Sequence, residues 1–197
     1  MLLDLSFYRF GFSPEFVKVG ILVMMLLIVV FTDLRERRIP HPVTILGTGL
    51  GLLFSFIIPV DNRPLEWLFR RAGWFLEGPS SWVMGSVAGA LVGGGLFFAV
   101  GEAFYYLGGK QKEYLGFGDV MLMLMVGSYL GAPLTLMTIL LGSLLGTLLA
   151  VPLTLASARF RDYPWPYGTF LGCVAIYVSL DGARLLDAYL RWSGFPG

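Results

Sequence analysis

Residues 14–40 read PEFVKVGILVMMLLIVVFTDLRERRIP, an apolar run that opens at a proline and ends in a cluster of charges. The preceding Ser13, with Pro14 and Glu15, has the composition of a helix start: a capping hydroxyl, a first-turn proline and an acid at the positive end of the dipole. At 1.5 Å per residue, residues 14–32 are about long enough to cross a bilayer core. Because charges follow, and not a small-residue cleavage site, the stretch predicts a membrane helix and not a signal peptide.

Composition places the whole chain in the membrane class. Hydrophobic residues make up 56% of the 197 residues and charged residues 14%, whereas an ordinary soluble domain is roughly 25% charged. The net charge of +1 gives no electrostatic basis for a nucleic-acid partner. Cys173 is the single cysteine and His41 the single histidine, so we expect no intrachain disulfide, no metal site and no cofactor.

The apolar segments predict an all-α, polytopic membrane protein, with residues 1–197 forming a single transmembrane domain. About six transmembrane helices are expected, at residues 14–32, 42–58, 81–107, 119–130, 134–158 and 168–190. Between residues 64 and 76, apolar side chains fall on one helical stripe with charges opposite, which is typical of an amphipathic helix lying in the membrane interface. Gly131-Ala132-Pro133 predicts a tight turn between the fourth and fifth spans.

Two side-chain patterns within the spans predict contacts. Glycines recur at four-residue spacing in the third and fifth spans, namely Gly85, Gly89 and Gly93, then Gly142 and Gly146. This small-xxx-small spacing lets helix backbones approach closely, although glycine is also simply common in membrane helices. In the last span Arg184 and Asp187 are three residues apart, which predicts an ion pair.

Three carboxylates lie at or inside the ends of spans, where an ionisable group is costly and a functional candidate. Asp33 closes the first helix, where the dipole disfavours it, although neighbouring arginines are a simple alternative explanation. Asp119 follows Gly116-Phe117-Gly118 and opens a segment of about 18 Å, shorter than the membrane core. It is either an N-cap in water or an acid held in an aqueous cavity below the surface. Glu102 either lines that cavity or, as we favour, extends to the interface.

Topology brings two of these carboxylates together. With six alternating spans, Asp33 and Asp119 reach the same membrane face. Two carboxylates held close cannot both ionise readily, so one keeps a proton. One can then activate water while the other protonates a substrate carbonyl, as in aspartic proteases. A slight excess of Lys and Arg in the loops at 33–42, 108–118 and 159–167 predicts that this face is cytoplasmic.

Three motifs resemble those of a known family. Residues 33–40, DLRERRIP, look like the first aspartate motif of the type IV prepilin peptidases, and residues 116–119, GFGD, look like their GxGD motif. Residues 166–171, PYGTFL, resemble the P-F-G-x-F-L signature that opens their final helix. The resemblance covers roughly residues 16–180. It implies a membrane aspartyl endopeptidase with Asp33 and Asp119 as its catalytic pair.

By this resemblance, the substrate is a prepilin, pseudopilin or preflagellin, whose short basic leader is removed on the cytoplasmic side of the cell membrane. Membrane lipids are the other expected partner. The motif residues expected to support the site are Gly116, Gly118, Arg38, Pro40, Pro166, Tyr167 and Gly168.

The sequence departs from the family pattern in three respects. His41 stands where asparagine is frequent, and Met121 stands where a lysine commonly follows the GxGD motif. The family's cytosolic domain with paired CxxC motifs, to which methyltransferase activity is attributed, has no counterpart in this sequence. The resemblance is therefore to the short form of the family.

Two readings from other classes compete with the peptidase. A small proton- or cation-coupled transporter or channel would use Asp33, Glu102 and Asp119 as an ion path. Nothing in the sequence suggests the inverted repeats of many transporters. A structural membrane subunit is the third reading, and it leaves the three motifs unexplained.

Overall fold

The computed structural model describes residues 11–60, 62–71, 73, 78–107, 116–156 and 165–193, and regular structure in these residues is helical. The helices are α2 (Pro14–Glu36), α3 (His41–Phe54), α4 (Arg63–Arg71), α5 (Pro79–Leu107), α6 (Phe117–Ala156) and α7 (Tyr167–Ser193). Within the described residues, α2, α5, α6 and α7 are long and apolar enough to cross a membrane, whereas α3 is apolar but short. The all-α membrane class is confirmed, and the count of six crossings stays a prediction. Parts of two expected elements, residues 72, 74–76 and 157–158, lie outside the described residues.

Helix α2 continues one turn beyond the predicted end at residue 32. Its start is as predicted, with the Phe16 N–H donating to Ser13 Oγ at 3.3 Å. The helix ends at Arg37, which adopts the left-handed conformation (φ 54°, ψ 39°) and donates its N–H to the Asp33 carbonyl at 2.9 Å. Asp33 therefore lies inside the last helical turn, where its side chain is held on a helix face.

Helix α3 ends earlier than the predicted residue 58. The Phe54 carbonyl accepts from the N–H groups of Ile57 (3.0 Å) and Ile58 (2.8 Å), which closes a turn just before Pro59. Proline disfavours the helical conformation in the residue before it. The helix therefore has 14 residues, about 21 Å of rise.

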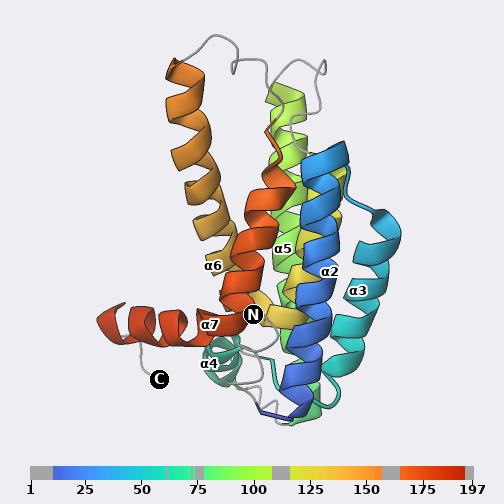
Figure 1. The fold of residues 1–197 in the computed structure, drawn as a ribbon. Helices are drawn as coiled ribbons and strands as arrows, with labels where there is room; N and C mark the ends of the chain where they lie inside the picture. The colour runs from blue at the N-terminus through green and yellow to red at the C-terminus, as the bar shows by residue number, and fades with distance from the viewer. Residues whose placement is uncertain are drawn as a thin grey trace.

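Helix α6 reverses direction at Gly131, so its 40 assigned residues form two arms (Figure 1). Gly131 has φ 77° and ψ 171°, a conformation open to glycine. Asp119 at the start and Gly146 in the second arm both lie beside the first turn of α7, whereas Leu134, just after the reversal, contacts Gly182 further along α7. The arms are therefore antiparallel, which confirms the predicted turn at residues 131–133.

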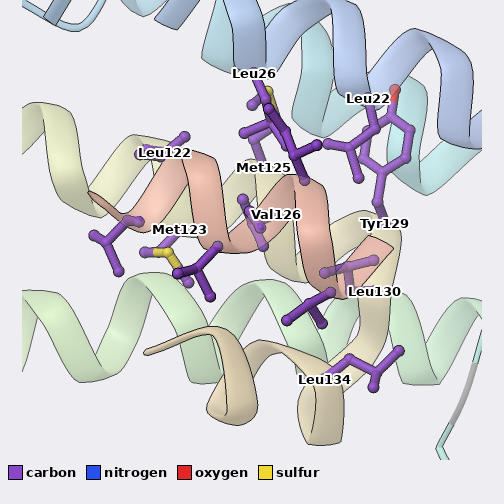
Figure 2. Packing of buried hydrophobic residues seen from close by; sticks show 14 of the residues in the cluster. Leu22, Leu26, Leu122, Met123, Met125, Val126, Tyr129, Leu130 and Leu134 are labelled. Carbon is purple, nitrogen blue, oxygen red and sulfur yellow. The ribbon is translucent and has the colours of Figure 1, made fainter. Parts of the chain in front are cut away.

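The first arm of α6 is the centre of the bundle. Every residue from 125 to 131 is buried, as expected for a helix that is apolar on all sides. Figure 2 shows Leu22 and Leu26 of α2 above this arm, facing Met125 and Tyr129. The arm that carries Asp119 is thus fixed by packing from its neighbours.

Helix α5 packs against the first arm through Gly89 and Gly93 of the predicted glycine ladder, whereas Gly85 faces Asn62. A Cβ atom at Gly89 would overlap the Gly127 carbonyl, and one at Gly93 would overlap the Met123 carbonyl. The Ser86 hydroxyl donates to the Ser128 carbonyl across the same contact at 2.6 Å. The two backbones touch, which confirms close helix approach at these glycines.

At the end of the bundle away from Asp119, α4 contacts the C-terminal part of α7 (Figure 1). Arg63 of α4 pairs with Asp187 of α7 at 2.6 Å. The predicted Arg184–Asp187 pair is wrong: Arg184 lies 3.5 Å from Asp181 instead. Asp187 has a partner from another element, which spacing along one helix could not reveal.

Candidate active site

Asp33 is buried and held by the start of α7. Its side chain is 6% exposed. Its Oδ2 accepts hydrogen bonds from the Thr169 N–H at 2.6 Å and the Thr169 hydroxyl at 2.8 Å. The first N–H groups of a helix have no partner within the helix and suit an anion. One oxygen of Asp33 is therefore fixed by two donors.

Asp119 lies in the first turn of α6, and its N–H donates to the Gly116 carbonyl at 2.9 Å. A Cβ at Gly118 would lie 2.9 Å from Ile39 Cβ, so a glycine there lets α6 begin directly against the 37–40 loop. The His41 and Phe117 rings meet edge to face, with centroids 5.7 Å apart. The GxGD segment thus docks on the segment that follows Asp33.

Gly168 lies between the two carboxylates. A Cβ atom at this position would be 3.2 Å from Asp33 Oδ2 and also 3.2 Å from Asp119 Oδ1. The two oxygens therefore lie within twice that distance of each other. The three predicted motifs, far apart along the chain, converge on one point.

The two aspartates face a cavity of about 950 Å³, near the upper end of the usual range for ligand pockets. The predicted site residues that line it are Asp33, Arg38, Pro40, Gly116, Gly118, Asp119, Pro166, Tyr167 and Gly168. Glu36 and Arg37 add further charge to the wall. Both carboxylates are therefore reached from a single cavity with a partly charged wall.

The remaining candidate residues differ in whether they line this cavity. Glu102 is exposed and does not line this cavity. Of the two single residues that depart from the family pattern, His41 lines the cavity and Met121 does not. Among the described residues, no three His, Cys, Asp or Glu side chains gather closely enough to hold a metal ion.

Thr169 was not singled out by sequence reasoning, although it holds Asp33. The available signal was a hydroxyl residue in the first turn of a helix, which often bonds a nearby group. The adjacent Tyr167 is also fixed, with its hydroxyl 2.6 Å from Ser143 Oγ in the second arm of α6. The start of α7 is therefore anchored on both sides.

Comparison with known proteins identifies a family. A model of the type IV leader peptidase family matches residues 20–151. The chain is 31% identical over 189 residues to a prepilin leader peptidase/N-methyltransferase of Xanthomonas campestris, covering 96% of this chain and 58% of the relative. It is 30% identical over 153 residues to the protein of that name from Pseudomonas aeruginosa, covering 74% of this chain and 51% of the relative. An Aeromonas salmonicida relative is 28% identical over 175 residues, covering 87% and 50%.

The chain thus spans about half the length of the curated relatives that it matches. No solved structure matches it.

Proposed function

This chain belongs to the type IV leader peptidase family, and on that premise we propose that it is a membrane aspartyl endopeptidase whose catalytic residues are Asp33 and Asp119. The observation that carries the proposal is the approach of both carboxylates to Gly168 inside one cavity. Two carboxyl groups this close disfavour ionisation of both at once, so the ionised one can act as general base and the protonated one as general acid.

The proposed mechanism assigns the charge to Asp33. Its Oδ2 receives two hydrogen bonds from Thr169, and such donors favour the ionised carboxylate. Asp33 then removes a proton from water as the water attacks the scissile carbonyl carbon. Asp119, which keeps its proton, donates it to the carbonyl oxygen. Collapse of the resulting tetrahedral diol breaks the C–N bond: the departing amine takes the proton that Asp33 removed from water, and Asp119 accepts a proton from a diol hydroxyl, which restores both acids.

The chain is proposed to cross the membrane six times, through α2, α3, α5, both arms of α6, and α7. On the second arm Leu140, Leu144 and Leu148 are 65%, 59% and 67% exposed, a surface suited to lipid and costly in water. The first arm, like α3, is shorter than the bilayer core, so the dyad lies below the membrane surface. The cavity is proposed to open to the cytoplasm.

The proposed substrate is a prepilin, pseudopilin or preflagellin with a short basic leader; the relatives are named as prepilin leader peptidases. Glu36 lines the cavity and supplies a negative charge for a basic leader residue. An extended leader entering beside Glu36 would present its last residues to the dyad.

The decisive experiment compares Asp33→Asn, Asp119→Asn and Glu102→Gln in purified protein. We expect each aspartate variant to lose cleavage of a leader-bearing pilin by at least a thousandfold while retaining its melting temperature. Glu102→Gln should cleave normally, because this exposed residue lies outside the cavity. A transporter that uses all three acids would instead show ion flux in liposomes that each substitution reduces, and cleavage by none of the proteins.

A further inference from the structure

A second cavity lies at the opposite end of α2 from the dyad. It has a volume of about 190 Å³ and is bordered by α2, the first arm of α6 and α7, with Lys18, Tyr129 and Ser179 among its lining residues. Lys18 precedes Asp33 by fifteen residues on the same helix, about 22 Å of rise. This cavity is therefore separate from the proposed active site.

Two residues with buried polar groups line this cavity, and the dyad uses neither of them. Lys18 is 7% exposed and Tyr129 is 2% exposed. No hydrogen-bond partner for the Tyr129 hydroxyl is found in the part of the chain that the structure describes. In Figure 2 this hydroxyl points from the first arm toward α2, beside Leu22. A buried ammonium and an unpaired phenol each cost free energy unless a partner is supplied.

The chemistry of these groups specifies the partner. A lysine ammonium only donates hydrogen bonds, and a tyrosine hydroxyl donates one readily. Together they suit an anionic oxygen, as in a phosphate. Glu15 also lines the cavity and interacts electrostatically with Lys18, so a cationic group on the same ligand would be stabilised there. The volume far exceeds the roughly 30 Å³ that one liquid water occupies.

We propose that this cavity binds the headgroup of an aminophospholipid, with its phosphate at Lys18 and Tyr129 and its amine at Glu15. The remaining wall is largely apolar, including Leu22, Leu134 and Val178, and suits the glycerol and first acyl carbons. The cavity lies at one end of a spanning helix, the depth at which lipid headgroups are found. The proposal does not depend on the catalytic role of the dyad.

Native mass spectrometry of delipidated protein in detergent tests this proposal. The probes are dioleoylphosphatidylethanolamine, dioleoylphosphatidylglycerol and soluble phosphoethanolamine. We expect one phosphatidylethanolamine per protein, bound at least tenfold more tightly than either other probe. Lys18→Gln and Tyr129→Phe should each weaken it about tenfold, since a hydrogen bond to a charged group contributes roughly that factor. Glu15→Gln should reduce the preference over phosphatidylglycerol.

The matched control is Tyr177→Phe, which removes a hydroxyl from a half-exposed tyrosine of α7 outside the cavity and should leave binding unchanged. Phosphoethanolamine binding as tightly as the lipid would overturn the lipid assignment. Equal affinity for both lipids, or no effect of Lys18→Gln and Tyr129→Phe, would overturn the headgroup site.

Thermal unfolding gives an independent readout that also reports folding. In lipid-free detergent Tyr129→Phe should melt at or above the wild-type temperature, because it removes an unpaired buried hydroxyl. With phosphatidylethanolamine present, the wild type should gain more stability than the variant. An equal gain for both proteins would contradict the proposed contact.

Discussion

Gly168→Ala tests the site geometry directly, because it places one methyl group between the two carboxylates. The new Cβ would lie 3.2 Å from an oxygen of each aspartate and 2.8 Å from Ile39 Cδ1. Overpacking of this kind costs about 1–3 kcal/mol. Alanine also favours the helix over glycine by about 1 kcal/mol. The expected net loss of stability is therefore about 0–2 kcal/mol, and the variant should fold.

We expect Gly168→Ala to reduce catalytic activity much more than it reduces folding stability. Atoms at 3.2 Å from a new Cβ must move by a few tenths of an ångström, and a catalytic group misplaced by about 1 Å can cost roughly 100-fold in rate. We expect kcat to fall about 10- to 100-fold with little change in KM. The assay is cleavage of a leader-bearing pilin in detergent, with the melting temperature measured in the same buffer.

Gly172→Ala is the matched control, one turn further along α7. Its Cβ would lie 2.6 Å from Val30 Cγ2 and contact neither aspartate. This variant should lose similar stability and keep kcat within about twofold. Wild-type kcat in Gly168→Ala, or an equal loss in both variants, would refute the assignment of the two carboxylates to one catalytic point.

Three further predictions follow from individual contacts. Thr169→Val should lower kcat about tenfold, because it removes one of two hydrogen bonds to Asp33. Thr169→Ser keeps the hydroxyl and should keep wild-type kcat; equal activity in both variants would show that the hydroxyl does not contribute to catalysis. Gly89→Leu should prevent recovery of folded protein from membranes, because its Cβ meets the Gly127 carbonyl, whereas Gly95→Leu, where the structure leaves open space, should fold normally. Cysteines at Arg38 and Arg70, in a Cys173→Ser background, should react with an impermeant reagent from opposite sides of the membrane; labelling from one side would contradict the proposed crossings.

Much of the fold was predictable because prolines and glycines mark helix ends. Ser13, Pro14 and the turn at Gly131 all act as the sequence pattern indicates. The predicted helix ends are wrong where hydrogen bonds between nearby backbone groups decide the last residue of the helix. The carbonyls of Phe54 and Asp33 accept bonds that close α3 early and extend α2 by a turn, and composition does not distinguish these outcomes.

The site was predictable as a set of motifs but not as a set of contacts. Counting alternating spans predicts that Asp33 and Asp119 lie at the same end of the bundle. Their positions on either side of Gly168 agree with that prediction. The role of Thr169 is not predictable from the sequence pattern, because it depends on a contact with an aspartate 136 residues away. The Asp187 partner was missed for the same reason, since Arg63 lies on another helix. Pairs between distant elements become visible only in three dimensions.

The bond between Thr169 and Asp33 also has a consequence for the timing of biosynthesis. Proteins emerge from the ribosome from the N-terminus, so Asp33 enters the membrane long before α7 is made. Until α7 has been made, the Asp33 carboxylate lacks both hydrogen-bond donors of Thr169. Gly168 is then also missing from its position between the two aspartates. The proposed peptidase is therefore inactive while it is being synthesised, and cleavage activity reports that the last helix has been inserted.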